Sequence, residues 1–473
     1  MIPLDLHPDR LFPADPAVRA LARSLYAAVR DLPIVSPHGH TDPQWYADNA
    51  RFADPSALFI VPDHYVFRML YSQGVPLDAL GVPRRAATSG AAGKYDSRAI
   101  WRIFASSYHL FRGTPTRLWL DHAFNMVFGI DERLTVDSAD RYFDRIAACL
   151  ADQAFRPRAL FERFNIEVIA TTESPLDPLV HHQAIRASGW GGRVLTAYRP
   201  DPVVDPQFEN FAANVAQFGA LTGEDTASWA GYLAAHRTRR AFFKSMGATS
   251  TDHGHPTART LDLDRAACQR LLDRALQGTI SADDAESFRA QMLTEMARMS
   301  VDDDLVMQIH PGSFRNHNPL IFESYGRDKG ADIPMRTDYV DALKPLLDNV
   351  GNERGLTIIL FTLDETTYAR ELAPLAGHYP TLKLGPPWWF HDSFQGMLRF
   401  LEQAIETAGF ANTAGFNDDT RAFMSIPARH DVWRRVACRF LANCVVEHRF
   451  GEDEAFELAP QLAYGLAKSS YRL

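Results

Sequence analysis

Short apolar runs that end in polar residues alternate with longer stretches of helical periodicity along most of the chain. Strand side chains alternate between two faces, whereas apolar positions on a helix recur every three to four residues, so the two patterns can be told apart. Strand-like runs occur at residues 33–40, 166–173, 193–201, 247–255, 305–312, 356–364, 381–389 and 414–421. Eight strands that alternate with helices predict an α/β protein in which a parallel sheet closes into a (βα)8 barrel.

Two regions depart from this alternation. Residues 17–31 form a predicted leader helix in which Leu21, Leu25 and Val29 make an apolar stripe. Residues 45–159 are rich in aromatic residues and helical periodicity but poor in strand patterns, which predicts a helical insertion after the first strand. We therefore expect three parts, namely a leader at 1–32, a barrel made of 33–44 and 160–473, and an insertion at 45–159 that covers part of the active site.

Length and composition fit a globular protein that is larger than a bare barrel. A (βα)8 barrel needs roughly 250 residues, whereas this chain has 473, of which 46% are hydrophobic and 23% are charged. The formal charge of −9 leaves no broad basic surface and argues against nucleic acid as a partner. An acidic substrate would therefore need a local arginine.

The cysteines and the chain's hydropathy indicate a cytoplasmic protein. The four cysteines include no Cys-x-x-Cys pair, which favours a reducing compartment over a disulfide framework. The first ten residues lack the apolar core of a signal peptide, and no later run is long enough to span a bilayer. We expect no membrane partner and a homo-oligomeric assembly.

Polar residues gather where the predicted strands end. The loops at the carboxyl ends of barrel strands build the active site of such folds, so this repeated position predicts chemistry there. The clusters are His38 and His40, Glu173, Arg199 and Asp201, Asp252 with His253 and His255, His310 with Arg315, Asp364 and Glu365, Trp388 and Trp389, and Asp418, Asp419 and Arg421.

The first cluster predicts a metal site. His38 and His40 are two residues apart, so their imidazoles fall on one face of the chain and can meet one ion. Asp419 at the eighth strand supplies a third ligand, because the eighth strand of a barrel lies beside the first. His310 is a fourth ligand, a hydrogen-bonding neighbour of the metal site, or a structural histidine.

A second His-x-His pair, His253 and His255, competes with the first. It could be a metal pair, a substrate contact or a hydrogen-bonding cluster of the loop. Two-metal barrels often bridge their ions with a modified lysine on the fourth strand, and no lysine lies at 247–255. We therefore expect one divalent ion, preferably Zn²⁺.

Motifs spread over almost the whole chain resemble the uronate (glucuronate) isomerase family of the amidohydrolase superfamily. They are His38-Gly39-His40, Asp63-His64-Tyr65 with Arg68 and Met69, Phe164-Asn165 leading to Thr171-Thr172-Glu173, Arg199-Pro200-Asp201, Gln308-Ile309-His310 with Arg315-Asn316 and Asn318, Trp388-Trp389-Phe390 with Asp392, and Asp419-Thr420-Arg421. The family often has threonine before its strand-eight aspartate, where this chain has Asp418.

The resemblance implies reversible conversion of D-glucuronate to D-fructuronate and of D-galacturonate to D-tagaturonate. It implies His38, His40 and Asp419 as metal ligands, and it places His64, Tyr65, Arg199 and Arg421 at catalytic or substrate-contact positions. To the substrate-binding candidates we add His310, Arg315, Trp388, Trp389 and Arg68.

The chemistry of such a reaction agrees with these residue types. A planar guanidinium such as that of Arg199 can hold a uronate carboxylate with two hydrogen bonds, although Arg-Pro-Asp also suits a surface turn. Tyr65 could move a proton during ring opening or be a core tyrosine. Asp419 would carry the C2 proton to C1, while Arg421 holds the enediolate oxygens and a divalent ion stabilises their charge.

Two other functions fit parts of this pattern. A metal-dependent hydrolase of the same superfamily would share the metal ligands but would not need an anion clamp at Arg199. A catalytically silent uronate-binding barrel would keep Arg199 but would not need the metal ligands. Assays of lactones and amides beside uronates, and the metal content of the purified protein, distinguish the three.

Overall fold

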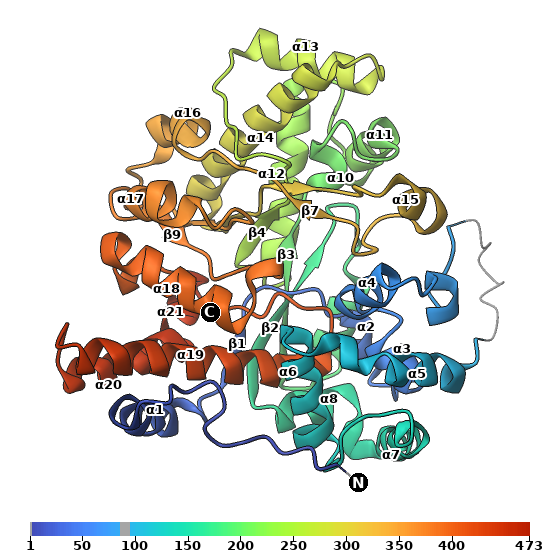
Figure 1. Cartoon of the computed structure of the whole chain (residues 1–473). Helices are drawn as coiled ribbons and strands as arrows, with labels where there is room; N and C mark the ends of the chain where they lie inside the picture. The colour runs from blue at the N-terminus through green and yellow to red at the C-terminus, as the bar shows by residue number, and fades with distance from the viewer. Residues whose placement is uncertain (1, 86–94) are drawn as a thin grey trace.

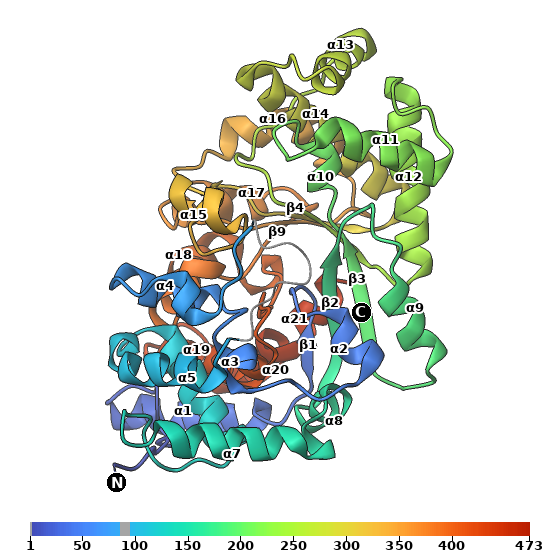
Figure 2. The same cartoon turned by 90° about the vertical axis from the view of Figure 1, so that its right-hand side faces the viewer.

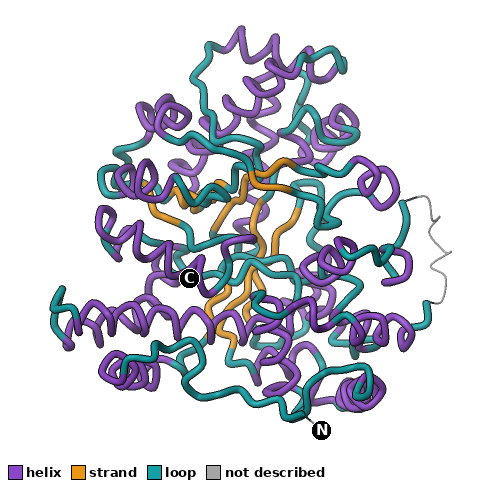
Figure 3. Tube along the Cα trace, viewed as in Figure 1, coloured by secondary structure: helices purple, strands orange, loops and turns teal. Residues whose placement is uncertain are grey.

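A parallel sheet lies at the centre of the molecule and is surrounded by helices (Figure 3). The computed structural model describes residues 2–85 and 95–473. Seven strands form one curled sheet in the order β1-β2-β3-β4-β5-β8-β9, and all neighbouring pairs are parallel. They are β1 (Ile34–Ser36), β2 (Ile166–Glu173), β3 (Arg193–Tyr198), β4 (Ser250–His253), β5 (Val306–Ile309), β8 (Ile358–Leu360) and β9 (Leu382–Leu384). Each lies within one of the first seven predicted runs, although β1 ends at Ser36, so His38 and His40 stand in the loop after it.

The eighth predicted run, 414–421, is not a regular strand. Thr413 makes a single parallel bridge with Leu384, and the Ala414 amide donates to the Leu384 carbonyl at 2.8 Å. At its other end the run meets the first strand's loop, where the His40 amide donates to the Thr420 carbonyl at 3.0 Å. This stretch, 413–420 (the eighth segment), therefore lies between β9 and the loop after β1 with little ladder pairing.

The helices cover the sheet and extend to both ends of the molecule (Figure 1). They are α1 (Pro16–Val29), α2 (Pro43–Asp48), α3 (Pro55–Phe59), α4 (His64–Ser72), α5 (Ser97–Ser106), α6 (Pro115–His122), α7 (Ala139–Ala151), α8 (Pro157–Arg163), α9 (Val180–Ala187), α10 (Asp201–Val204), α11 (Phe211–Thr222), α12 (Trp229–Ser245), α13 (Arg265–Leu276), α14 (Ala282–Asp303), α15 (Pro319–Tyr325), α16 (Val340–Val350), α17 (Ala373–Ala376), α18 (Phe394–Ala408), α19 (Ile426–Val446), α20 (Glu452–Pro460) and α21 (Leu466–Ser470). A small antiparallel pair, β6 (Ser313–Phe314) and β7 (Ile333–Pro334), flanks α15.

The leader helix begins at Pro16, where Asp15 caps it by accepting hydrogen bonds from two backbone amides. Leu25 and Val29 of the predicted stripe are fully buried, whereas Leu21 is only partly buried. The helix packs against α19 and α20 rather than directly on a strand. Its apolar face is therefore covered by the last helices of the chain, which lie beside it in Figure 1.

Every regular element described between residues 45 and 159 is a helix, a 3-10 helix or a π-helical turn, apart from a lone bridge between Pro3 and Glu132. These helices share a hydrophobic cluster that includes the buried aromatic residues Trp101, Phe104 and Phe124. In Figure 2 helices α4 to α8 lie together at one end of the molecule, beside the amino-terminal segment. The aromatic residues of this stretch thus belong to a second core, which the insertion shares with Ile34 of β1, Ile166 of β2 and Val194 of β3.

Two further sequence features have a structural counterpart. All four cysteines are buried and unpaired, and burial raises the pKa of Cys438 to about 12. Among the helices of residues 2–85 and 95–473, none combines the length and apolar composition that crossing a bilayer would require.

Candidate metal centre and substrate cavity

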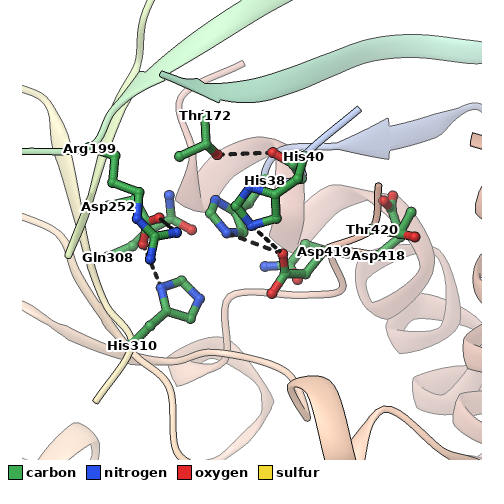
Figure 4. Close-up of polar contacts among 12 residues, drawn as sticks. His38, His40, Thr172, Arg199, Asp252, Gln308, His310, Asp418, Asp419 and Thr420 are labelled. Carbon is green, nitrogen blue, oxygen red and sulfur yellow. Dashed lines mark hydrogen bonds and ion pairs between the residues drawn. The ribbon is translucent and has the colours of Figure 1, made fainter. Parts of the chain in front are cut away.

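Three side chains from the two ends of the chain meet above the carboxyl end of β1 (Figure 4). The Nε2 atoms of His38 and His40 lie 3.4 and 3.1 Å from Oδ1 of Asp419. Between the histidines, a Cβ atom on Gly39 would lie 3.3 Å from the Thr420 carbonyl, so a side chain here would crowd the eighth segment. Glycine therefore allows the two loops to approach closely enough for the three ligating atoms to meet.

This candidate metal cluster, His38, His40 and Asp419, has the donors that a divalent ion needs. Its ligating atoms all lie within 4.8 Å of one another, and burial lowers the pKa of His40, which favours the neutral imidazole that binds metals. Burial alone would raise the pKa of Asp419, but the neighbouring histidines hold it far below its usual range. Two imidazoles and one carboxylate are a recognised ligand set with room for a further ligand, so the residues fit a metal.

The two adjacent carboxylates of the eighth segment have different partners. Asp419 turns toward the histidines with its backbone in the left-handed region at φ 36°, which is uncommon for a residue other than glycine. Asp418 is buried and its Oδ2 pairs with Nε2 of His430 at 3.1 Å. Asp419 is thus the carboxylate that geometry offers to a metal.

Asp252 at the end of β4 connects the cluster to its surroundings, and the sequence analysis did not select it as a site residue. It is fully buried and accepts a hydrogen bond from His310 Nδ1 at 2.7 Å and from Arg199 Nη1 at 2.9 Å. Although burial raises the pKa of a carboxylate, Arg199 and His310 hold the pKa of Asp252 well below its usual range. Successive residues of a strand face opposite sides, so Asp252 and His253 of β4 point in opposite directions, and Asp252 is the one that points inward. This alternation could have been used to select Asp252 from the sequence.

His310 presents its second nitrogen to the site. Because Nδ1 is bonded to Asp252, Nε2 is the free ring atom, and within the described residues it is buried without a hydrogen-bond partner. The ring stacks against His38 at 4.9 Å and against Phe361 at 3.9 Å. His38, Asp252 and His310 also form a second set of potential ligands, but the bonds to Asp252 already use its oxygens. This arrangement favours His310 as a hydrogen-bonding neighbour of the metal.

A cavity of about 660 Å³ opens beside the cluster and is lined by most of the predicted site residues. Its lining includes Arg199, Arg289, Arg315, Arg327 and Arg421, and the three predicted ones among them differ in how they are paired. Arg199 is bonded to Asp201 and Asp252, and Arg315 is bonded to Asp332, whereas Arg421 makes no ion pair within the described residues. Arg421 therefore carries the least neutralised charge of the three.

The aromatic residues of the predicted site have different roles. His64 and Tyr65 on α4 line the cavity with their rings stacked at 4.8 Å, and burial raises the pKa of Tyr65 and lowers that of His64. Trp388 and Trp389 also line it, with Trp388 packed edge-on against His310 at 4.7 Å. Arg68 is the one predicted site residue that does not line the cavity, because its guanidinium lies over the Phe390 ring.

Other cavity residues were not anticipated. Arg327 and Asp328 line the cavity from the loop between α15 and β7, whereas Asp201, which also lines it, belongs to the predicted Arg199-Pro200-Asp201 motif. Arg421, Arg315 and Arg199 lower the pKa of Asp328 against the opposing effect of burial. The loop between α15 and β7 is polar and has no strand-like or helix-like pattern of apolar residues, so its sequence gave no sign that it faces the cavity.

The second His-x-His pair does not form a three-ligand cluster within the described residues. His253 is fully buried and its Nε2 lies 3.0 Å from the Thr251 hydroxyl, whereas His255 lines the cavity. A side chain on Gly254 would collide with Arg199 and Asp201, and the Gly254 amide donates to Asp201. The motif is therefore a close-packed turn under Arg199.

Asp364 and Glu365 do not line the cavity, and Glu365 pairs with Arg399.

Glu173 ends β2 but does not line the cavity; it accepts a hydrogen bond from the Thr196 hydroxyl. Burial raises its pKa from 4.5 to about 8.

The folded chain thus keeps a proton on Glu173 that the unfolded chain releases. The free energy of unfolding should therefore fall as pH rises from 4.5 to about 8, by about 1.4 kcal/mol per pH unit at most. In Glu173→Gln this decrease should be smaller, as urea unfolding across that pH range would measure. Equal slopes in both proteins would contradict the raised pKa.

The fold and the site together define a parallel α/β protein that carries a candidate metal centre beside an arginine-lined cavity. The chain also matches the family model described as glucuronate isomerase over residues 17–471. The chain therefore belongs to the glucuronate isomerase family, and its members are aldose–ketose isomerases.

Individual relatives agree with this assignment. The uronate isomerase of Phenylobacterium zucineum is 66% identical over 471 residues, covering 100% of this chain and 97% of the relative. The crystal structure of glucuronate isomerase from Caulobacter crescentus superposes with a TM-score of 0.97 at 62% identity, covering 99% and 97% of the two chains. The crystal structure of uronate isomerase from Thermotoga maritima has a TM-score of 0.91 at 26% identity and covers 99% of each.

Proposed function

We propose that this chain interconverts aldose and ketose hexuronates, D-glucuronate with D-fructuronate and D-galacturonate with D-tagaturonate, by moving a proton between C2 and C1. The observation that carries this proposal is the meeting of the candidate metal cluster with Arg199, Arg315 and Arg421 at one cavity. Names of the relatives supply the substrate class. Arginines supply what a substrate carboxylate and an enediolate both need, which is fixed positive charge.

His38, His40 and Asp419 would hold one divalent ion, for which we propose Zn²⁺. When bound, such an ion stabilises negative charge on the sugar's oxygens. His310, held by Asp252, turns its Nε2 toward the same region and would donate to or accept from a substrate oxygen. The ion pairs around Asp252 keep this orientation fixed.

Asp419 is the proposed carrier of the proton. Its carboxylate would take the proton from C2 and return it to C1, since it faces the cavity beside His38 and His40. Arg421 would hold the enediolate oxygens. His64 and Tyr65 would serve ring opening by moving a proton at the ring oxygen and the anomeric hydroxyl.

Substrate is oriented by groups on three sides of the cavity. Arg199 and Arg315 each share their guanidinium with carboxylates of the chain, and their remaining N–H groups would bind the uronate carboxylate. Trp388 and Trp389 would exclude water from the reacting carbons. Arg68 would act indirectly, through its stacking on Phe390.

We also propose how the parts of the chain divide this work. The eighth segment would close the sheet into a (βα)8 barrel of the amidohydrolase kind, supported by its contacts with β9 and with the loop after β1. The insertion at 45–159 would cover the site, because His64 and Tyr65 reach the cavity from α4. The leader at 1–32 would brace α19 and α20. Cytoplasmic location and a homo-oligomeric assembly remain predictions.

Removing the metal tests this function directly. The purified protein should lose ketose formation from both uronates after chelation, and added Zn²⁺ should restore it, because two imidazoles and one carboxylate can hold zinc. Mn²⁺, Fe²⁺ and Co²⁺ are tested beside it, since the same ligand set also suits Fe²⁺. Lactones and amides in the same assay report hydrolase activity, and D-glucose reports whether the carboxylate is needed. Full activity of the chelated protein, confirmed metal-free by elemental analysis, would contradict the metal's role.

A further inference from the structure

A buried arginine outside the cavity connects three segments that carry site residues. Arg429 lies in the first turn of α19 and is 1% exposed. It does not line the cavity. A cation near a helix amino terminus is opposed by the helix dipole, so helix stability does not explain an arginine here.

The contacts of Arg429 reach the segments of Asp419 and the two tryptophans. Its Nη1 donates to the Asp418 carbonyl at 3.2 Å and also pairs with Asp392, which follows Trp389 by three residues. Its Nε donates to the Ser425 hydroxyl at 3.0 Å. Within the described residues Nη2 is buried and has no hydrogen-bond partner, so the guanidinium is held by its other nitrogens and by stacking.

The guanidinium also stacks in an aromatic corner next to Tyr65. It lies over the Trp119 ring at 3.5 Å and near the Tyr65 ring at 5.3 Å, and these two rings meet edge to face at 5.5 Å. A planar guanidinium can stack on an aromatic face and still hydrogen-bond at its edge, which a lysine ammonium cannot do. Arg429 therefore joins α4, the loop after β9 and the eighth segment at one point.

The bond to the Asp418 carbonyl has a specific geometric effect. This carbonyl belongs to the peptide that links Asp418 to Asp419, and the direction of that peptide sets the φ angle of Asp419. At φ 36° Asp419 is in the left-handed region, which a non-glycine residue leaves unless its surroundings hold it. His430 adds a second restraint by binding the Asp418 carboxylate at 3.1 Å.

We propose that Arg429 is a positioning residue that fixes the Asp418–Asp419 peptide and the Tyr65 ring together, so that Asp419 faces His38 and His40. This inference rests on the proposed function of Asp419 but concerns a residue that touches neither substrate nor the candidate metal cluster. Without the bond from Nη1, the peptide can rotate toward negative φ and carry the Asp419 carboxylate away from the histidines.

The test is Arg429→Lys, with Arg240→Lys as its matched control. Arg240 on α12 is also fully buried and paired with an aspartate, Asp303, but it does not line the cavity. Both variants should lose stability. Only Arg429→Lys should bind Zn²⁺ about 10- to 100-fold more weakly when the apoprotein is titrated, and its kcat should fall by a similar factor with KM changed less than about threefold, since substrate contacts are intact.

Each outcome decides the question. Wild-type affinity and kcat in folded Arg429→Lys would overturn the proposal, and so would an equal loss in Arg240→Lys, which would show a general effect of disturbing a buried arginine. If Arg429→Lys does not fold, the isosteric Asp392→Asn decides, because it loosens the guanidinium without removing it. A fall in the Zn²⁺ affinity of Asp392→Asn, smaller than the one expected for Arg429→Lys, supports the proposal. An unchanged Zn²⁺ affinity of Asp392→Asn overturns it. Failure of the proposed function is a different result, since the wild-type protein would then form no ketose from either uronate.

Discussion

Asp419→Asn is expected to lower kcat for uronate isomerisation by about 10³-fold, within the range that general acid–base groups contribute. The asparagine keeps the shape of the side chain but cannot take a proton from C2, and it weakens the ligand set of His38 and His40. Ketose formation should be measured together with metal content. Retention of metal with loss of kcat would assign the proton transfer to Asp419, whereas full activity with metal bound would exclude that role.

The neighbouring Asp418 is the matched control for this substitution. Asp418 is also a buried carboxylate of the eighth segment, but its partner is His430 rather than the candidate metal cluster. Asp418→Asn retains a hydrogen-bonding side chain of the same size. Its kcat should stay within about tenfold of the wild-type value. A larger loss in Asp418→Asn than in Asp419→Asn would mean that the two carboxylates have been assigned the wrong way round.

Arg421→Met should lower kcat by about 10²- to 10³-fold, the loss found when one preorganised donor to a developing oxyanion is removed. Because Arg421 makes no direct ion pair within the described residues, its removal breaks no such contact, although it takes away the largest of the charges that lower the pKa of Asp328. The free energy of unfolding should therefore fall by about 1 kcal/mol or less. Steady-state kinetics and urea unfolding of the same preparation measure both quantities.

Arg199→Met provides the contrasting case. Its guanidinium is bonded to Asp201 and to the fully buried Asp252, so truncation leaves a buried charge without its partner. We expect a loss of about 3 kcal/mol or more in unfolding free energy, together with a higher KM for uronates. If Arg421→Met is less stable than Arg199→Met, or if Arg421→Met keeps its kcat, then the proposed difference between the two arginines is wrong. That difference is a catalytic role for Arg421 and ion pairing with Asp201 and Asp252 for Arg199.

Seven of the eight predicted strands are confirmed because strand formation in a parallel sheet follows from local composition. A buried strand needs a short run of apolar and β-branched residues, and 166–173 is such a run that became β2 without a shift at either end. The run 414–421 was wrong as a regular strand because Asn417, Asp418 and Asp419 make side-chain contacts and φ angles that compete with ladder pairing.

Candidate site residues could be named from the sequence where position along a strand was informative. His38 and His40 follow β1, and the Asp419-Thr420-Arg421 motif marks the other side of the cluster. Asp252 was overlooked because the adjacent His253 and His255 carried the more familiar metal-ligand pattern. The pattern was misleading because Gly254 ends the strand, so the two histidines do not share one face.

The amino-acid sequence by itself determined the order of strands and helices, the family, and which polar residues stand at strand ends, because each depends on neighbouring residues or on motifs within one segment. Only the tertiary structure decided which carboxylate faces the histidines, that Arg421 makes no ion pair with a described residue, and that Arg429 meets the Asp418 carbonyl. Those facts depend on contacts between segments that are far apart in the chain, and their distances and angles are set by packing that no local pattern encodes.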